Sequence, residues 1–284
     1  MNAWALDAFI IGGLLSVAAV GLALHLRLVR FFDLSWALWA MSAGLLGVYV
    51  ARRSPSVVLA VLMGTLLGAT LGALEDGLIL RKALTSFIPP DVLERFSFAA
   101  ALAIYLAIVS TTELLGFRDQ EFVQARPWSW HGLSDPQLTT AVSCWSALLI
   151  CAAIRTTRLG IKIRALLDSP SAYAQLGFSV SLPSAIVGLI AGGLTGLAGA
   201  CFGLLYLAHY SMGLALMLLA VIPCLLLGLQ SSFRTVIAAV LTSAAIAGIR
   251  YRLGYTASEY VIYSLILFLL ILRPRGLRGH VREV

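Results

Sequence analysis

Nine apolar segments follow one another along the chain, separated by short polar or charged stretches. A helix needs about 20 consecutive apolar residues to span a bilayer, and most of these segments are close to that length. The pattern therefore predicts an all-α polytopic membrane protein with about eight or nine transmembrane helices. The segments lie at about 7–25, 34–51, 56–80, 96–116, 137–154, 183–209, 212–229, 233–249 and 258–272.

Two of the segments are marginal as complete crossings. Segment 34–51 starts directly after Asp33, and segment 212–229 contains Pro223. Each is either a full crossing or a broken, half-spanning helix. A broken helix is tolerated at membrane depth only where it faces protein or a water-filled cavity.

The composition agrees with a membrane protein and excludes several other classes. The chain has 284 residues, of which 60% are hydrophobic and 12% are charged, and its mean hydropathy is +0.95. A soluble domain carries about twice that charged fraction. No stretch between the apolar segments is long enough for a soluble catalytic domain of about 100 residues. We therefore expect a single transmembrane domain over residues 1–284.

The net charge of +7 predicts the orientation of the helices. Basic residues are retained on the cytosolic side of a membrane. If all nine segments cross and the C-terminus is cytosolic, 14 of the 20 basic residues lie in inside loops. This orientation predicts a cytosolic loop at 155–182 and an outside loop at 117–136. It also accounts for the positive charge without a nucleic-acid partner.

Two segments share a glycine ladder. The first contains Gly64, Gly68 and Gly72, and the second contains Gly188, Gly192 and Gly196, followed by Gly199. Spacing of four places each trio on one face of a helix, where a neighbouring backbone can approach closely. The offset of 124 residues between the trios suggests an internal structural repeat, as many transport folds have. Ordinary helix packing explains the spacing equally well.

The chain lacks the common signatures of enzymes. It has no GxxxxGK[ST] phosphate loop, no H-E-x-x-H and no G-x-S-x-G sequence. None of its four cysteines has the spacing of a metal site. We expect neither catalysis nor a cofactor or metal ion bound by this chain.

Ionisable residues at membrane depth are candidates for function because their insertion costs free energy. Asp33, Glu75 and Asp76 lie near segment ends, as do Glu113 and His209. Pairing of Glu75 and Asp76 with Arg81 or Lys82 is the simplest interpretation. No acid lies clearly at mid-helix, which argues against a proton-coupled pump.

The predicted cytosolic loop contains signals for one short helix. Ser169 can cap the helix, Pro170 suits its first turn, and Gly177 can take the left-handed position after its end. Asp168 at the start suits the helix dipole. A helix of about two turns is not stable alone, so it must dock against something. It either contacts a soluble partner or lies on the bilayer surface.

Several sequences in and after this loop resemble those of branched-chain amino-acid-type ABC importer permeases. In the loop they are TRLG (157–160), RA (164–165), DSP (168–170) and AQLG (174–177). Beyond it, GLAG (196–199), SMG (211–213) and RPRGL (273–277) are similar to later parts of the family. Residues 32–35 (FDLS) resemble the related sugar-permease branch instead. The resemblance covers most of the chain.

The resemblance implies a transmembrane subunit of a bacterial inner-membrane importer. It implies two cytosolic ATPase subunits that bind ATP and Mg²⁺, a second permease chain, similar or identical, and an extracytoplasmic solute-binding protein. The solutes it implies are branched-chain or other amino acids, amides or urea. Asp33 and Ser35 are candidates for the translocation path. The residues implied in ATPase coupling are Arg158, Gly160, Arg164, Asp168, Ser169, Pro170, Tyr173, Ala174, Leu176 and Gly177.

Two other function classes remain open at this stage. One is a self-contained secondary transporter or channel, which would need no ATPase and would use intramembrane charges. The other is a structural membrane subunit of a larger complex. Uptake by the isolated chain in proteoliposomes would separate the first of these from the others.

Overall fold

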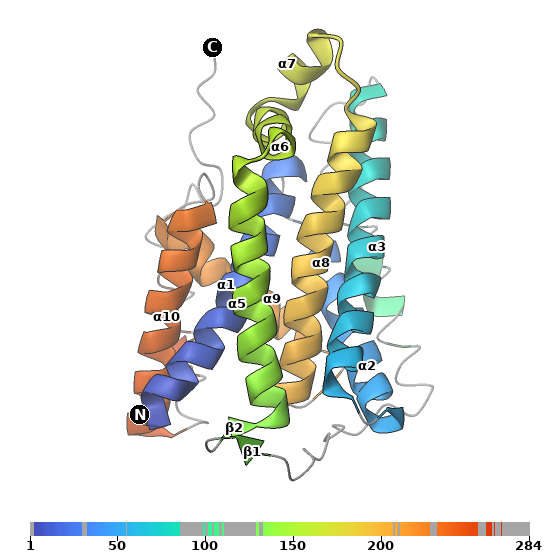
Figure 1. The fold of residues 1–284 in the computed structure, drawn as a ribbon. Coiled ribbons are helices and arrows are strands. Elements are labelled where there is room, and N and C mark those ends of the chain that lie inside the picture. Colours follow the sequence, from blue (N-terminus) through green and yellow to red (C-terminus); the bar gives the residue numbers. More distant parts are fainter. Residues whose placement is uncertain are drawn as a thin grey trace.

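The computed structural model describes most of the helical part of the chain (Figure 1). The described residues are 3–29, 33–54, 56–85, 129–130, 133–206, 208–209, 211–227 and 232–254, with 99, 102–103, 105–107, 110, 260–262, 264 and 268. The helices are α1 (Ala3–Val29), α2 (Ser35–Arg53), α3 (Val57–Thr85), α5 (Asp135–Thr156), α6 (Arg158–Asp168), α7 (Pro170–Gln175), α8 (Ser181–Leu205), α9 (Met212–Leu227) and α10 (Ser232–Leu253).

The fold class predicted from the sequence is confirmed: the chain is an all-α polytopic membrane protein. In the described part, five helices are long and apolar enough to cross a membrane: Trp4–Val29, Val57–Asp76, Pro136–Thr156, Ser181–Leu205 and Ser232–Leu253. The predicted segments 96–116 and 258–272 lie mostly outside the described residues. A two-residue antiparallel pair, β1 (Ser129–Trp130) and β2 (Leu133–Ser134), precedes α5 and was not expected.

The molecule has two distinct ends. Figure 1 shows α6 and α7 at one end, where α3 ends and α8 begins, and β1 and β2 at the other, close to the start of α1. We refer to these as the α7 end and the β1–β2 end.

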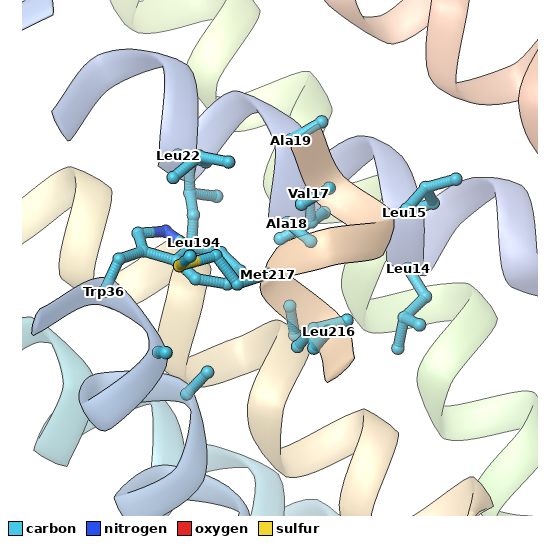
Figure 2. Close-up of a cluster of buried hydrophobic side chains, with 14 of the residues drawn as sticks. Leu14, Leu15, Val17, Ala18, Ala19, Leu22, Trp36, Leu194, Leu216 and Met217 are labelled. Atoms are coloured by element: carbon cyan, nitrogen blue, oxygen red, sulfur yellow. The ribbon is translucent and has the colours of Figure 1, made fainter. Parts of the chain in front are cut away.

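The two marginal segments form continuous helices in the interior. α2 is 19 residues long, about 28 Å at 1.5 Å per residue, and α9 is 16 residues long with Pro223 inside it. Both contribute to one apolar core with α1 and α8. Figure 2 shows Leu22 of α1 and Trp36 of α2 near Leu194 of α8 and Met217 of α9. α2 and α9 are therefore surrounded by protein over much of their surface.

The two glycine ladders face each other across the α3–α8 interface. A methyl group added at Gly192 would overlap the carbonyl oxygen of Gly68 and lie 2.9 Å from the Cα of Gly72. Gly196 meets Gly64 and Gly68 in the same way, and Gly188 meets Gly72. The backbones approach this closely because neither face carries a Cβ. Packing thus accounts for the shared spacing, while an internal repeat remains a hypothesis.

Glycines also allow close packing of α2 against α8 and α9. A methyl group at Gly199 would overlap the carbonyl oxygen of Ala40, and one at Gly213 would overlap that of Ala37. α2 is therefore held close to both later helices.

Candidate functional site: a buried polar cluster beneath α7

A sharp corner connects α5 to α6. Gly160 allows it, because a Cβ there would overlap the carbonyl oxygen of Ile154 and lie 2.7 Å from that of Arg155. The hydroxyl of Thr157 accepts a hydrogen bond from the Gly160 N–H at 3.2 Å and caps α6. Arg164 closes the corner by donating from Nη2 to the carbonyl of Arg155 at 3.3 Å. Gly160 and Arg164 therefore shape the corner itself.

The short helix α7 has the ends that the sequence predicts. The Ser169 hydroxyl accepts a hydrogen bond from the Ala172 N–H at 3.3 Å, and Pro170 occupies the first turn. Gly177 follows the helix with φ at +82°, in the left-handed region that favours glycine. α6, by contrast, was not predicted as a separate helix.

Docking of α7 depends on Tyr173. Its side chain is only 8% exposed and packs in a small apolar cluster with Leu28 of α1, Leu166 and Leu167 of α6, and Val187 of α8. Tyr173, which the resemblance implies in ATPase coupling, is therefore buried within this chain and is not exposed for contact with a partner. Ala174 on α7 is exposed, and Leu176, directly after the helix, is 74% exposed.

An ion pair joins the α6–α7 junction to α1. The Arg27 guanidinium donates from Nη2 to Asp168 Oδ1 at 2.9 Å. Arg27 is in the last turn of α1, and Asp168 is the last residue of α6, two residues before α7 begins. Arg158 and Lys162 on α6 are exposed to the surroundings.

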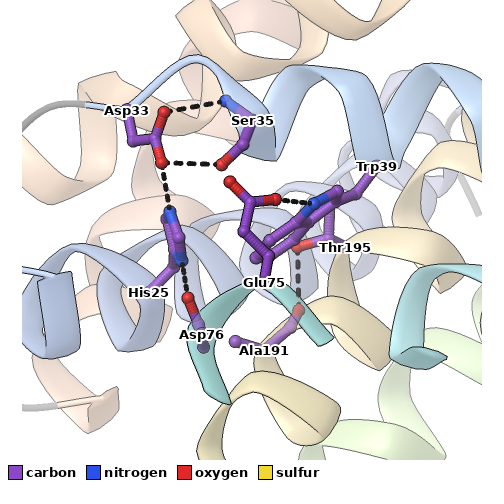
Figure 3. Close-up of polar contacts among 8 residues, drawn as sticks. All are labelled: His25, Asp33, Ser35, Trp39, Glu75, Asp76, Ala191 and Thr195. Atoms are coloured by element: carbon purple, nitrogen blue, oxygen red, sulfur yellow. Dashed lines mark hydrogen bonds and ion pairs between the residues drawn. The ribbon is translucent and has the colours of Figure 1, made fainter. Parts of the chain in front are cut away.

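A buried polar cluster lies in the helix bundle close to this junction (Figure 3). His25 of α1 is fully buried between two fully buried carboxylates. Its Nδ1 is 3.0 Å from Asp76 Oδ1 of α3, and its Nε2 is 3.7 Å from Asp33 Oδ2. Only the protonated imidazolium presents a donor at both nitrogens, so the geometry fits a cation held between two anions. The cluster thereby ties α1, α3 and the start of α2 together.

Asp33 also organises the start of α2. Its carboxylate accepts hydrogen bonds from the Ser35 backbone N–H at 3.2 Å and from the Ser35 hydroxyl at 2.8 Å. Asp33 lies in the connection between α1 and α2. Burial alone would raise the pKa of its carboxyl, but the facing His25 ring and the Ser35 donors hold this pKa below its ordinary value. Asp33 and Ser35 are 0% and 2% exposed, so their place on a translocation path stays a prediction.

Trp39 connects Glu75 to the cluster. The indole Nε1 donates a hydrogen bond to Glu75 Oε2 at 2.7 Å. The same indole packs edge-on against the His25 ring, with ring centres 4.7 Å apart. Figure 3 shows Glu75 and Asp76 entering the cluster from α3, with Ala191 and Thr195 of α8 beside them. Asp76 therefore pairs with a residue of α1, and Glu75 accepts a hydrogen bond from a residue of α2.

The centre of this site was missed in the sequence. Glu75 and Asp76 were expected to pair with Arg81 or Lys82, whereas Asp76 faces His25 and Glu75 accepts a hydrogen bond from Trp39. The side chains of Arg81 and Lys82 are outside the described residues. The available signal was His25 itself, a lone ionisable residue inside an apolar helix, which is a candidate by its insertion cost.

Comparison with known proteins gives one match. The sequence model of a family described as branched-chain amino acid transport system / permease component matches residues 5–272. No curated protein and no solved structure matches the chain. The matched range contains the polar cluster, the α5–α6 corner and α7.

Proposed function

Because the chain belongs to the family of branched-chain amino acid transport permeases, we propose that it is the transmembrane subunit of a bacterial ABC importer. The solute is a small polar molecule, such as a branched-chain or other amino acid, an amide or urea. Family membership supports the role, and the sequence supports placement in the inner membrane with a cytosolic C-terminus. This chain would bind no nucleotide itself, and ATP and Mg²⁺ would be bound by its partners.

The observation that carries the proposal is the placement of α7. It is a capped helix of six residues at one end of the bundle, with Ala174 exposed on it and Leu176 exposed directly after it. A helix this short keeps its geometry only through docking, and Tyr173 supplies the inner contact. The exposed outer face is then available to a cytosolic ATPase.

The proposed assembly contains this permease, a second similar or identical permease, two ATPase subunits and an extracytoplasmic solute-binding protein. Closure of the ATPase dimer on ATP would move α7 and shift the helices between outward-open and inward-open states. A partner shifts such an equilibrium only if it binds the two states with different affinity. The contact made by α7 must therefore change between the states.

The path by which movement leaves α7 is short. Tyr173 packs in one apolar cluster with Leu28, and Asp168 pairs with neighbouring Arg27, so both interactions reach the last turn of α1. His25 lies two residues before Arg27 on the same helix and is paired with acids at the start of α2 and on α3. Displacement of α7 would thus reach three membrane helices through the end of α1.

Substitution of Ala174 by arginine tests the proposal. Ala174→Arg places a long charged side chain on the outer face of α7, where it would prevent close contact with the ATPase. We expect transport to be abolished and the ATPase to be lost from detergent pull-downs, while the folded chain stays in the membrane.

A matched substitution controls for the added charge. Ala165→Arg introduces the same side chain at an exposed position of α6, and it should retain the ATPase. Wild-type uptake by Ala174→Arg would remove the coupling role of α7.

Exchange of the Arg27–Asp168 charges tests the transmission path. Because Asp168 is 74% exposed, Asp168→Arg should change the free energy of unfolding by less than about 1 kcal/mol. Arg27→Asp or Asp168→Arg alone should lower solute uptake several-fold at an unchanged amount of bound ATPase. The combined exchange should restore uptake, and failure of the pair to recover would argue against transmission through this contact.

One observation favours a second candidate function. A self-contained secondary transporter would use intramembrane charges, and His25, Asp33 and Asp76 form a fully buried cluster of such charges. Solute uptake by the chain alone in proteoliposomes, driven by an ion gradient, would support this alternative. The importer proposal expects no such uptake without the ATPase.

A further inference from the structure

A cavity of about 480 Å³ opens at the β1–β2 end, far from α7 along the bundle. Four helices build it: the beginnings of α1 and α5 and the ends of α8 and α10. Among the described residues, its wall holds Asp7 as the one acid and Arg250 as the one base, together with Trp4, Tyr206 and Tyr251. A volume of this size suits a small molecule or a headgroup.

Interhelical hydrogen bonds hold these walls in place. The Ser243 hydroxyl of α10 donates to the Ala8 carbonyl of α1 at 3.2 Å, and Trp145 Nε1 of α5 donates to the Phe9 carbonyl at 3.3 Å. Arg250 Nη1 donates to the Tyr206 hydroxyl at 3.1 Å. The cavity is therefore a fixed feature of the packing between these helices.

The position of Arg250 is set by the same contacts. Its guanidinium lies 5.5 Å from the centre of the Tyr206 ring, in addition to its hydrogen bond with the hydroxyl. Ala247, Arg250 and Tyr251 are spaced by three and four residues, so they share one face of α10 that lines the cavity. A guanidinium has five N–H donors in a planar fork that suits phosphate oxygens.

Aromatic side chains indicate the depth of the cavity in the membrane. Trp4 is 41% exposed and Tyr251 is 73% exposed at its rim. Tryptophan and tyrosine concentrate at the level of lipid headgroups.

We propose that this cavity binds the headgroup of a zwitterionic aminophospholipid of the phosphatidylethanolamine type. The phosphate contacts Arg250, and the primary ammonium contacts Asp7. An anionic headgroup without an amine, such as that of phosphatidylglycerol, pairs with Arg250 but leaves Asp7 without a cation. The inference depends on the membrane location of the chain and not on the solute it transports.

Lipid binding to the purified full-length chain, measured by native mass spectrometry with phosphatidylethanolamine and phosphatidylglycerol, tests the proposal. Arg250→Gln is expected to weaken phosphatidylethanolamine binding about tenfold, because it removes hydrogen bonds from a charged donor. Asp7→Asn should remove the preference for phosphatidylethanolamine, which we expect to be roughly two- to fivefold in the unmodified chain.

The control is Arg252→Gln, two residues along the same helix and outside the cavity lining, which should bind both lipids as the unmodified chain does. If Arg250→Gln fails to fold, Arg250→Lys keeps the charge without the fork and should still bind less tightly than the unmodified chain. An equal loss of phosphatidylethanolamine binding in the Arg250 and Arg252 variants would overturn the proposal. So would equal binding of the two lipids by the unmodified chain. Displacement of the lipid by free leucine would overturn it in favour of a solute site.

Discussion

Replacement of Gly192 by alanine is expected to destabilise the protein far more than replacement of its neighbour Gly193. A Cβ at Gly192 would overlap the backbone of α3, which cannot move aside as a flexible side chain can. Alanine there forces α3 and α8 apart, and overpacking of this kind costs about 1–3 kcal/mol or more. A Cβ at Gly193 would meet only the Cβ of Ala69, at an ordinary distance of 3.6 Å.

The two substitutions add the same methyl group on the same helix, so they differ only in what that methyl group meets. Alanine favours a helix over glycine by about 1 kcal/mol. Gly193→Ala should therefore be neutral or slightly stabilising, and Gly192→Ala should lower the free energy of unfolding by about 2 kcal/mol or more. Unfolding of both purified variants in the same detergent measures this. Equal stability of the two variants would mean that the α3–α8 interface is looser than the structure shows.

The sequence predicts part of this α3–α8 interface but not all of it. The glycine spacing predicts two flat helix faces, because positions four apart lie on one side of a helix. It does not say that the two faces meet each other, since residues 64–72 and 188–196 are far apart in the chain and any helix could cover either. The partner of a face is decided by the packing of the whole bundle.

The loop that contains α7 shows the same division between local and tertiary structure. Ser169, Pro170 and Gly177 predict the ends of α7 because capping depends on neighbouring residues only. The role of Tyr173 depends on which face of α7 turns inward, and that is decided by Leu28 and Val187 on distant helices. A helix of six residues has too few positions for a periodic pattern to reveal its buried face.

The pairing of charges within the polar cluster could not be predicted from the sequence for an additional reason. Asp76 has Arg81 and Lys82 close by in sequence, which makes a local pairing the simplest interpretation. The structure instead places Asp76 beside Gly188, whose missing side chain leaves room for it, and opposite His25. Partners 51 residues apart can be matched only once α1 and α3 are known to be adjacent.

Substitution of His25 by leucine is expected to be among the most destabilising single changes in the chain. Leucine leaves Asp33 and Asp76 buried without a cation, and the loss of one member of a buried ion pair costs about 3–5 kcal/mol. The comparable change at His209, which lies outside the cluster, should cost much less. Unfolding of both variants in detergent gives the two values.

Neutralising the Asp33 and Asp76 carboxylates as well should then restore stability. If the cost arises from uncompensated carboxylates, the triple variant His25→Leu, Asp33→Asn, Asp76→Asn should be more stable than His25→Leu alone, although an amide in place of the Asp33 carboxylate accepts fewer hydrogen bonds from Ser35. Replacement of a whole buried ion group by neutral residues is often close to neutral, whereas removal of one partner is not. A triple variant no more stable than the single one would show that His25 acts through its packing against Trp39 and not through its charge.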